Sequence, residues 1–142
     1  MSCRVLVIGH GTLPQDMVNA AEMIYGEAEG VKVICLPPDQ DMDAYRAAIS
    51  GEIRDSAGEG LLILADFKGG TPFLTASRLM KDFWDQEVEL VTGLNLPMLT
   101  EVFNSMDGAT AAELADCAVQ AGAEGVTNFR QAIAARRQEE VK

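Results

Sequence analysis

The chain has 142 residues, of which 48% are hydrophobic and 23% charged, and its formal net charge is −11. This length suits a single domain with a buried core. The excess acid repels the phosphates of nucleic acid and of anionic membranes, so we expect no nucleic-acid partner and a protein partner with a positive surface. The longest apolar runs, such as residues 61–65, fall short of the ~20 residues of a membrane span. No secretory signal precedes His10, and we expect a cytoplasmic protein.

The side chains that bind metals are few and scattered. Cys3, Cys35 and Cys117 form no Cys-x-x-Cys pair and read as reduced thiols. His10 is the only histidine, so we expect no metal site. No glycine-rich loop has the spacing of a nucleotide-binding motif, and we expect no cofactor.

The first half of the chain alternates between strand and helix patterns. Residues 4–8 predict a buried strand that stops at the Gly9-His10-Gly11 turn. A helix then begins near Pro14, with Met17, Ala21, Ile24 and Ala28 as its apolar stripe. Residues 31–36 predict a second strand. A second helix carries Tyr45, Ile49 and Ile53 and ends near Gly58.

The second half repeats this alternation. Residues 61–65 form the third expected strand, and a helix with the stripe Phe73, Ser77, Met80 and Trp84 follows it. The fourth strand is expected at residues 88–92, with helices at 97–103 and through Ala111, Leu114, Ala115 and Ala118. The tail is ambiguous: residues 125–129 suit an extended edge strand, whereas 131–140 favour helix by propensity.

Such alternation predicts a single α/β domain with a mainly parallel open sheet and helices on both faces. The common strand order is 2-1-3-4, with the tail as a possible extra edge strand. Ligands of such sheets bind at the carboxyl ends of strands, where the strand order reverses. In this order the reversal lies between strands one and three, which end at His10 and Asp66.

His10 and Asp66 are the residues that this reasoning selects for chemistry. A neutral imidazole nitrogen can accept a phosphoryl group as a nucleophile if the other nitrogen is held by an acceptor. Asp66 is the best-placed acceptor, and Gly11 leaves the imidazole unobstructed. The alternative is that His10 only forms part of a turn and has no function. For a lone histidine in an arbitrary sequence, this alternative would be preferred.

The segment from Asp66 to Phe73 adds a predicted anion site. Gly69 and Gly70 allow close backbone approach, while Thr71 suits a helix N-cap and the proline after it suits the first helical position. The N–H groups at the start of this helix, through Phe73, would point at a phosphoryl group on the histidine. A plain capped helix after a glycine-rich turn is the competing interpretation.

A third polar residue follows the fourth strand. Asn95 lies in the segment Gly93-Leu94-Asn95-Leu96-Pro97-Met98-Leu99. Its side chain either orients a neighbouring loop through a hydrogen bond or only makes a turn.

Three blocks together, VLVIGHG, ADFKGGTPF and VTGLNLPML, resemble the IIA domain of the mannose/fructose/sorbose family of the bacterial phosphotransferase system. The similarity runs from Val5 to about Gly125. Two positions depart from the family pattern: Gly9 replaces a residue that is often small and polar, and Thr71 replaces a serine.

The resemblance implies a phosphotransferase in which His10 is phosphorylated and Asp66 orients it. It implies that phosphate comes from the phosphocarrier protein HPr and leaves to a IIB component, which phosphorylates a sugar entering through membrane components. Membrane association would then be only through IIB. The resemblance further implies a homodimer that exchanges a C-terminal edge strand, and the exposed edge of strand four favours pairing. We expect residues 1–142 to be one stand-alone IIA-type domain.

Two other functions use the same histidine. A regulatory phosphoprotein of an incomplete phosphotransferase system would carry an identical site. A phosphoryl donor of dihydroxyacetone kinase is related as well, although the Gly-Gly-Thr-Pro-Phe and Asn-Leu-Pro-Met-Leu blocks match the sugar family better.

Overall fold

The structure, a computed structural model, describes residues 3–141 and contains one parallel sheet. The strand order is β2-β1-β3-β4, which confirms the predicted 2-1-3-4 arrangement. The four strands are β1 (Arg4–His10), β2 (Val31–Leu36), β3 (Leu61–Ala65) and β4 (Val88–Thr92).

Strand β1 is longer than predicted and includes the histidine. Gly9 pairs with Cys35 and His10 with Leu36, and the N–H of Gly11 donates to the carbonyl oxygen of Leu36 at 2.8 Å. Because β2 runs to Leu36, it supplies partners that keep Gly9 and His10 extended. His10 is therefore the last residue of a strand and not part of a turn.

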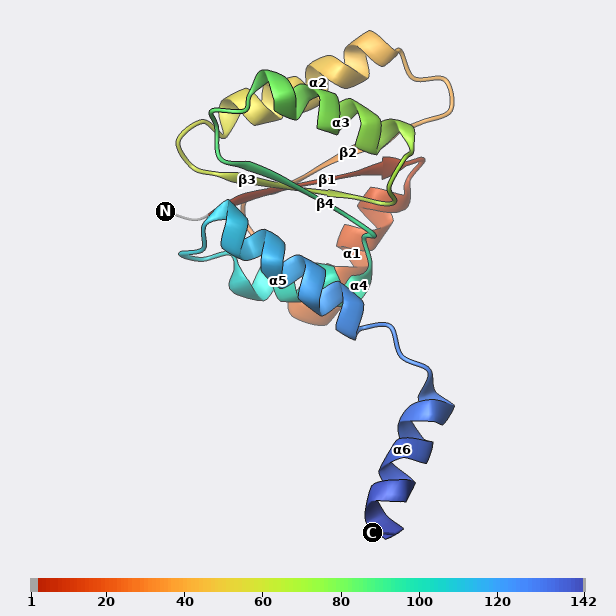
Figure 1. The fold of residues 1–142 in the computed structure, drawn as a ribbon. Helices are drawn as coiled ribbons and strands as arrows, with labels where there is room; N and C mark the ends of the chain where they lie inside the picture. The colour runs from red at the N-terminus through yellow and green to blue at the C-terminus, as the bar shows by residue number, and fades with distance from the viewer. Residues whose placement is uncertain (1–2, 142) are drawn as a thin grey trace.

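Helices cover both faces of the sheet (Figure 1). On one face lie α2 and α3, and on the other lie α1, α4 and α5. The helices are α1 (Leu13–Tyr25), α2 (Met42–Asp55), α3 (Thr71–Asp82), α4 (Leu96–Ser105), α5 (Ala111–Glu124) and α6 (Phe129–Val141). Among the described residues, no helix is long and apolar enough to cross a membrane.

The central strands contribute side chains to two hydrophobic cores, one on each face of the sheet. Leu6 and Ile8 of β1 pack on the face of α2 and α3, whereas Val5 and Val7 pack on the opposite face. All residues of β3 are buried, because this strand has neighbours on both sides and helices on both faces. Burial of such side chains is the main stabilising term of the fold and holds the carboxyl ends of β1 and β3 in place.

Two predicted helical stripes are wrong in detail. In α1 the buried residues are Pro14, Val18 and Ala21, while Ile24 is 66% exposed. The helix ends at Tyr25, where Gly26 takes a φ of +108° and turns the chain before the predicted stripe is complete.

In α3 the buried residues are Pro72, Ala76 and Leu79. Trp84 lies beyond the helix end at Asp82 and is 74% exposed. The predicted stripe followed the bulky aromatic residues, whereas the close approach of α3 to the sheet selects the small Ala76. By contrast, the stripes of α2 and α5 are confirmed, since all of their predicted members are buried.

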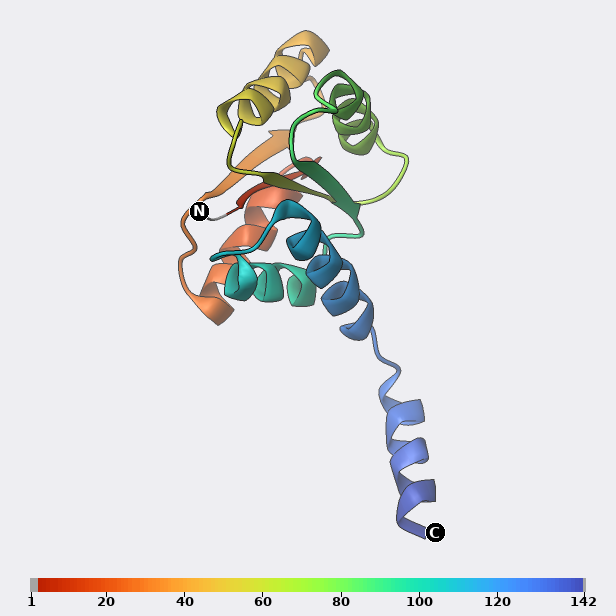
Figure 2. The same ribbon diagram turned by 60° about the vertical axis from the view of Figure 1, so that its left-hand side comes forward.

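The tail is helical. Helix α6 has no buried residue and stands away from the rest of the domain in both Figure 1 and Figure 2. The helix-forming composition of residues 131–140 prevails, so the described part of the chain contains no extra edge strand. Within residues 3–141, β4 pairs with β3 alone, which leaves its other edge open.

Candidate active site

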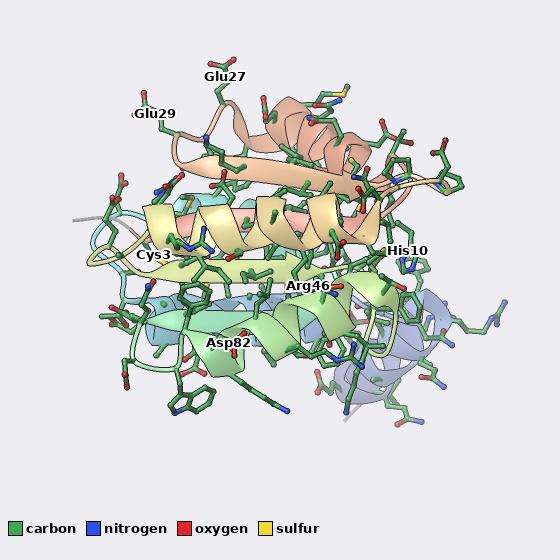
Figure 3. All side chains as sticks on the ribbon, turned by 90° about the horizontal axis from the view of Figure 1, so that it is seen from above. Cys3, His10, Glu27, Glu29, Arg46 and Asp82 are labelled. Atoms are coloured by element: carbon green, nitrogen blue, oxygen red, sulfur yellow. The ribbon has the colours of Figure 1, made fainter. Side chains whose placement is uncertain are left out.

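The candidate site lies at the carboxyl edge of the sheet, between β1 and β3. These strands are adjacent and parallel, so their last residues meet at the same edge. Figure 3 shows His10 at the opposite end of the sheet from Cys3, which lies at the amino end of β1. The chain leaves β1 for α1 on one face and β3 for α3 on the other, so the strand-order reversal is the expected ligand position.

His10 and Asp66 are joined by two hydrogen bonds. Oδ2 of Asp66 lies 2.7 Å from Nδ1 of the His10 imidazole and accepts the backbone N–H of His10 at 2.9 Å. The other carboxylate oxygen, Oδ1, accepts the backbone N–H of Phe67 at 2.9 Å. The carboxylate is thus held by three donors, two from His10, which is 56 residues away in sequence, and one from the adjacent Phe67.

The protonation state of this pair follows from its contacts. Burial alone would raise the pKa of Asp66, but the hydrogen bonds from His10 and Phe67 and the charge of His10 outweigh burial and lower it below its usual value. Asp66 is therefore an ionised carboxylate at neutral pH and can only accept. In the neutral form of the imidazole, Nδ1 therefore carries the proton and Nε2 has the lone pair.

The two partners differ in exposure. The Asp66 side chain is 7% exposed and the His10 side chain is 44% exposed. A buried holder and an accessible ring suit a reaction in which His10 meets a reagent from outside while Asp66 stays within the protein.

Phe67 and Gly70 also pack against the imidazole. The rings of Phe67 and His10 are stacked, with centroids 5.3 Å apart and an interplanar angle of 27°. A Cβ added at Gly70 would lie 2.7 Å from Cε1 of His10 and 2.9 Å from Cε1 of Phe67. The sequence predicts the close approach at Gly70 but not the contact of Phe67 with the imidazole. The signal for that contact is an aromatic residue directly after Asp66.

Helix α3 begins beside this ring, one residue earlier than predicted. Gly70 is its N-cap, Thr71 is the first helical residue, and no side chain makes a capping hydrogen bond. Thr71 therefore is not the N-cap, because the extended backbone of Gly70 (φ −80°, ψ 170°) already precedes the first turn. Gly69, with a φ of +97°, makes the preceding turn.

The first turn of α3 offers backbone donors. The first N–H groups of a helix have no intrahelical acceptor. Pro72 has no N–H, so Thr71 and Phe73 supply the donors of this turn together with the positive end of the helix dipole. An anion beside the His10 ring would meet this end of α3.

Asn95 and Gly11 shape the surroundings of the site. The two hydrogen bonds of the Asn95 side chain go to residues other than His10. Oδ1 of Asn95 accepts the N–H of Met98 at 3.0 Å and caps α4, while Nδ2 donates to the carbonyl oxygen of Gly122 at 3.1 Å. Asn95 thus joins two helices. Gly11 takes a φ of +57° where the chain turns from β1 into α1.

Gly9 packs directly on the holding carboxylate. A Cβ at this position would lie 3.0 Å from Cγ and Oδ2 of Asp66 and 3.0 Å from Cγ of Pro14. The departure from the family pattern at Gly9 therefore gives the Asp66 side chain space.

Among residues 3–141, no three His, Cys, Asp or Glu side chains gather in a group that could hold a metal ion.

Comparison with known proteins identifies the family of the chain. The family model of the phosphotransferase-system fructose IIA component matches residues 4–119. The mannose-specific EIIAB component of Escherichia coli is 31% identical over 128 residues, covering 89% of this chain and 39% of its own length. The fructose-specific EIIA component of Bacillus subtilis is 28% identical over 70% of this chain and 68% of its own.

A solved structure gives the same result. The phosphotransferase-system component EIIA of Streptococcus agalactiae superposes with a TM-score of 0.84 at 28% identity, covering 91% of this chain and 98% of that one. The fold and the site define a parallel α/β protein with a histidine–carboxylate pair at its strand-order reversal. The chain belongs to the IIA components of the mannose family of the sugar phosphotransferase system.

Proposed function

We propose that this protein is a phosphoryl carrier that accepts phosphate from phospho-HPr on Nε2 of His10 and passes it to a IIB component for coupled sugar uptake and phosphorylation. The observation that carries the proposal is the 2.7 Å contact between Nδ1 of His10 and Asp66. With Nδ1 holding the proton, Nε2 has the free electron pair that a nucleophile needs.

The transfer balances on the atoms of the site. The Nε2–P bond forms as the P–N bond of the donor phosphohistidine breaks, and that electron pair returns to the donor imidazole. His10 then has both nitrogens substituted, so its ring is cationic and lies beside the anionic Asp66. When a IIB nucleophile takes the phosphoryl group, the electron pair returns to Nε2. Positioning and charge stabilisation provide most of the rate of such transfers.

The first turn of α3 is the proposed binding site for the phosphoryl oxygens. Thr71 and Phe73 offer N–H groups there, and Gly69 and Gly70 bring the backbone close to the ring.

The surroundings of His10 suit a protein partner. Four partly exposed apolar side chains lie in the loops and first helical turns that follow β1, β2 and β3, and so at the same edge of the sheet: Leu13, Met42, Phe67 and Leu74. Exposed carboxylates accompany them at Asp39, Asp41 and Asp43. An apolar surface around His10 with an acidic border fits a protein partner whose own phosphoryl donor or acceptor residue is surrounded by positive charge.

The test is phosphorylation by phosphoenolpyruvate, enzyme I and HPr, followed by transfer to candidate IIB proteins. His10 is the only histidine, so His10→Ala is a complete blank. The label should be acid-labile and base-stable, and the variant should carry none. Label on the alanine variant, or label stable to acid, would refute the phosphohistidine mechanism.

We further propose that residues 1–142 act as one cytoplasmic IIA-type domain that forms a homodimer through the open edge of β4. An exposed strand edge is a template for pairing with another chain. Light scattering at micromolar concentration should give twice the monomer mass of 15.2 kDa. Hydrogen exchange should be slow at the β4 amides that point away from β3. A monomeric mass, or a dimer whose β4 amides exchange fast, would refute this interface.

A further inference from the structure

Phe67 is an exposed aromatic residue held in a defined position. The residue is 53% exposed, yet its ring stacks on the imidazole of His10 with centroids 5.3 Å apart. Its backbone N–H donates to Oδ1 of Asp66. Its Cε1 and Cζ would lie 2.9 and 3.0 Å from a Cβ at Gly70, so the missing side chain of Gly70 makes room for the ring.

Three of these contacts cover parts of the imidazole. Asp66 holds Nδ1, Gly70 lies against Cε1, and Phe67 covers one face of the ring. The side chain of His10 is nevertheless 44% exposed. Rotation of the imidazole away from this arrangement would break both the hydrogen bond and the aromatic stack.

The stack also matches the charge that phosphorylation creates. In the proposed transfer the imidazole is neutral before attack and cationic once Nε2 bears the phosphoryl group. A cation beside the face of an aromatic ring is attracted by the ring quadrupole, and stacked aromatic pairs gain further stabilisation beyond the area they bury. Phe67 therefore stabilises the phosphorylated ring more than the free one, which favours the transition state of attack.

We propose that Phe67 is a positioning residue for phosphoryl transfer: its ring fixes the imidazole of His10 with Nε2 outward and stabilises the cationic ring of phosphohistidine. This inference rests on the proposed function of His10. It assigns to the aromatic ring a role separate from any contribution that an exposed Phe67 makes to docking.

The variants Phe67→Leu, Phe67→Tyr and Phe67→Trp separate these roles. Leucine keeps an apolar side chain but has no aromatic face, whereas tyrosine and tryptophan keep one. Phe129→Leu is the matched control, because Phe129 is 76% exposed and belongs to α6, the helix that stands away from the sheet in Figure 1. All four substitutions are at exposed positions and should leave the unfolding transition unchanged.

Each variant is phosphorylated with two donors, phospho-HPr and the small molecule phosphoramidate. Phosphoramidate releases ammonia as its P–N bond breaks and requires no protein docking. We expect Phe67→Leu to react about three- to ten-fold more slowly with both donors, with the loss in the maximal rate and not in KM for phospho-HPr. Phe67→Tyr, Phe67→Trp and Phe129→Leu should stay within about two-fold of the unsubstituted protein.

Proton NMR of the unphosphorylated protein gives a readout that does not depend on transfer. The ring current of Phe67 should shift the Cε1 and Cδ2 protons of His10, and these shifts should change in Phe67→Leu and persist in Phe67→Tyr. A full rate in Phe67→Leu, a Phe67→Tyr variant as slow as leucine, or a defect seen only with phospho-HPr would overturn the inference. If the unsubstituted protein takes no label from either donor, the proposed function of His10 fails instead.

Discussion

Oδ2 of Asp66 accepts two hydrogen bonds from His10, one from the backbone N–H at 2.9 Å and one from the imidazole Nδ1 at 2.7 Å. The same oxygen therefore fixes the end of β1 and the direction of the ring that projects from it. The orientation of the His10 imidazole therefore depends on one side chain, that of Asp66, which directly follows the neighbouring strand β3.

Asp66→Ala tests the orientation of the ring. Alanine removes the acceptor that holds the imidazole proton on Nδ1, so Nε2 is no longer kept as the unprotonated nitrogen that attacks. We expect phosphorylation by phospho-HPr to slow by about 10²-fold or more, by analogy with other orienting carboxylates. Initial rates of label transfer measure the effect. A rate equal to that of the unsubstituted protein would mean that Asp66 does not orient the imidazole.

The stability of the protein in acid should depend on Asp66. Its pKa is lowered in the folded state, so its ionised form stabilises the fold above the unfolded-state pKa of about 3.9. This contribution is lost as the pH falls through the lowered folded-state pKa. Urea unfolding at a series of acidic pH values should show a flatter loss of stability in Asp66→Asn than in the unsubstituted protein. Parallel curves would contradict the linkage.

Gly70→Ala tests the close packing of the backbone against His10. The added Cβ would lie 2.7 Å from Cε1 of the imidazole, so the ring must move. The close atoms belong to the side chains of His10 and Phe67, which can shift, and the free energy of unfolding should therefore change little. We expect the rate of phosphoryl acceptance to fall by about ten-fold, since small displacements of reacting groups are costly.

Gly51→Ala is the control for that experiment. Gly51 lies in α2, and no atom stands within 4 Å of the Cβ that alanine would add. Alanine in this helix should leave the transfer rate unchanged and raise stability by about 0.5–1 kcal/mol. A Gly70→Ala protein that transfers phosphate as fast as Gly51→Ala would show that the packing at Gly70 is unimportant.

Asn95→Ala should affect stability and not transfer. Asn95 caps α4 and bonds to the end of α5, so its loss should cost about 1 kcal/mol in the free energy of unfolding. The phosphorylation rate should not change, because neither bond reaches His10. Asn104→Ala, at an exposed position in the last turn of α4, is the matched control for stability. A slower transfer in Asn95→Ala at full stability would give Asn95 a role in the site.

The sequence alone determined the alternation of strands and helices, and the common 2-1-3-4 order of such sheets then predicts which two strand ends meet at the site. Strand and helix periods are local properties, and the handedness of parallel crossovers then limits how the strands are arranged. For this reason His10 and Asp66 are predicted as neighbours although they are 56 residues apart. The helical propensity of residues 131–140 likewise indicates the helix seen as α6.

Only the tertiary structure decided which side chains pack together. The buried faces of α1 and α3 depend on how closely each helix approaches the sheet, and small residues such as Ala76 take positions that size alone would give to aromatic ones. The stack of Phe67 on His10 has the same origin, since it needs the missing side chain of Gly70 and the carboxylate of Asp66 to position both rings. Contacts of this kind join segments whose relative placement no local pattern contains, because they depend on the fit of several side chains at once.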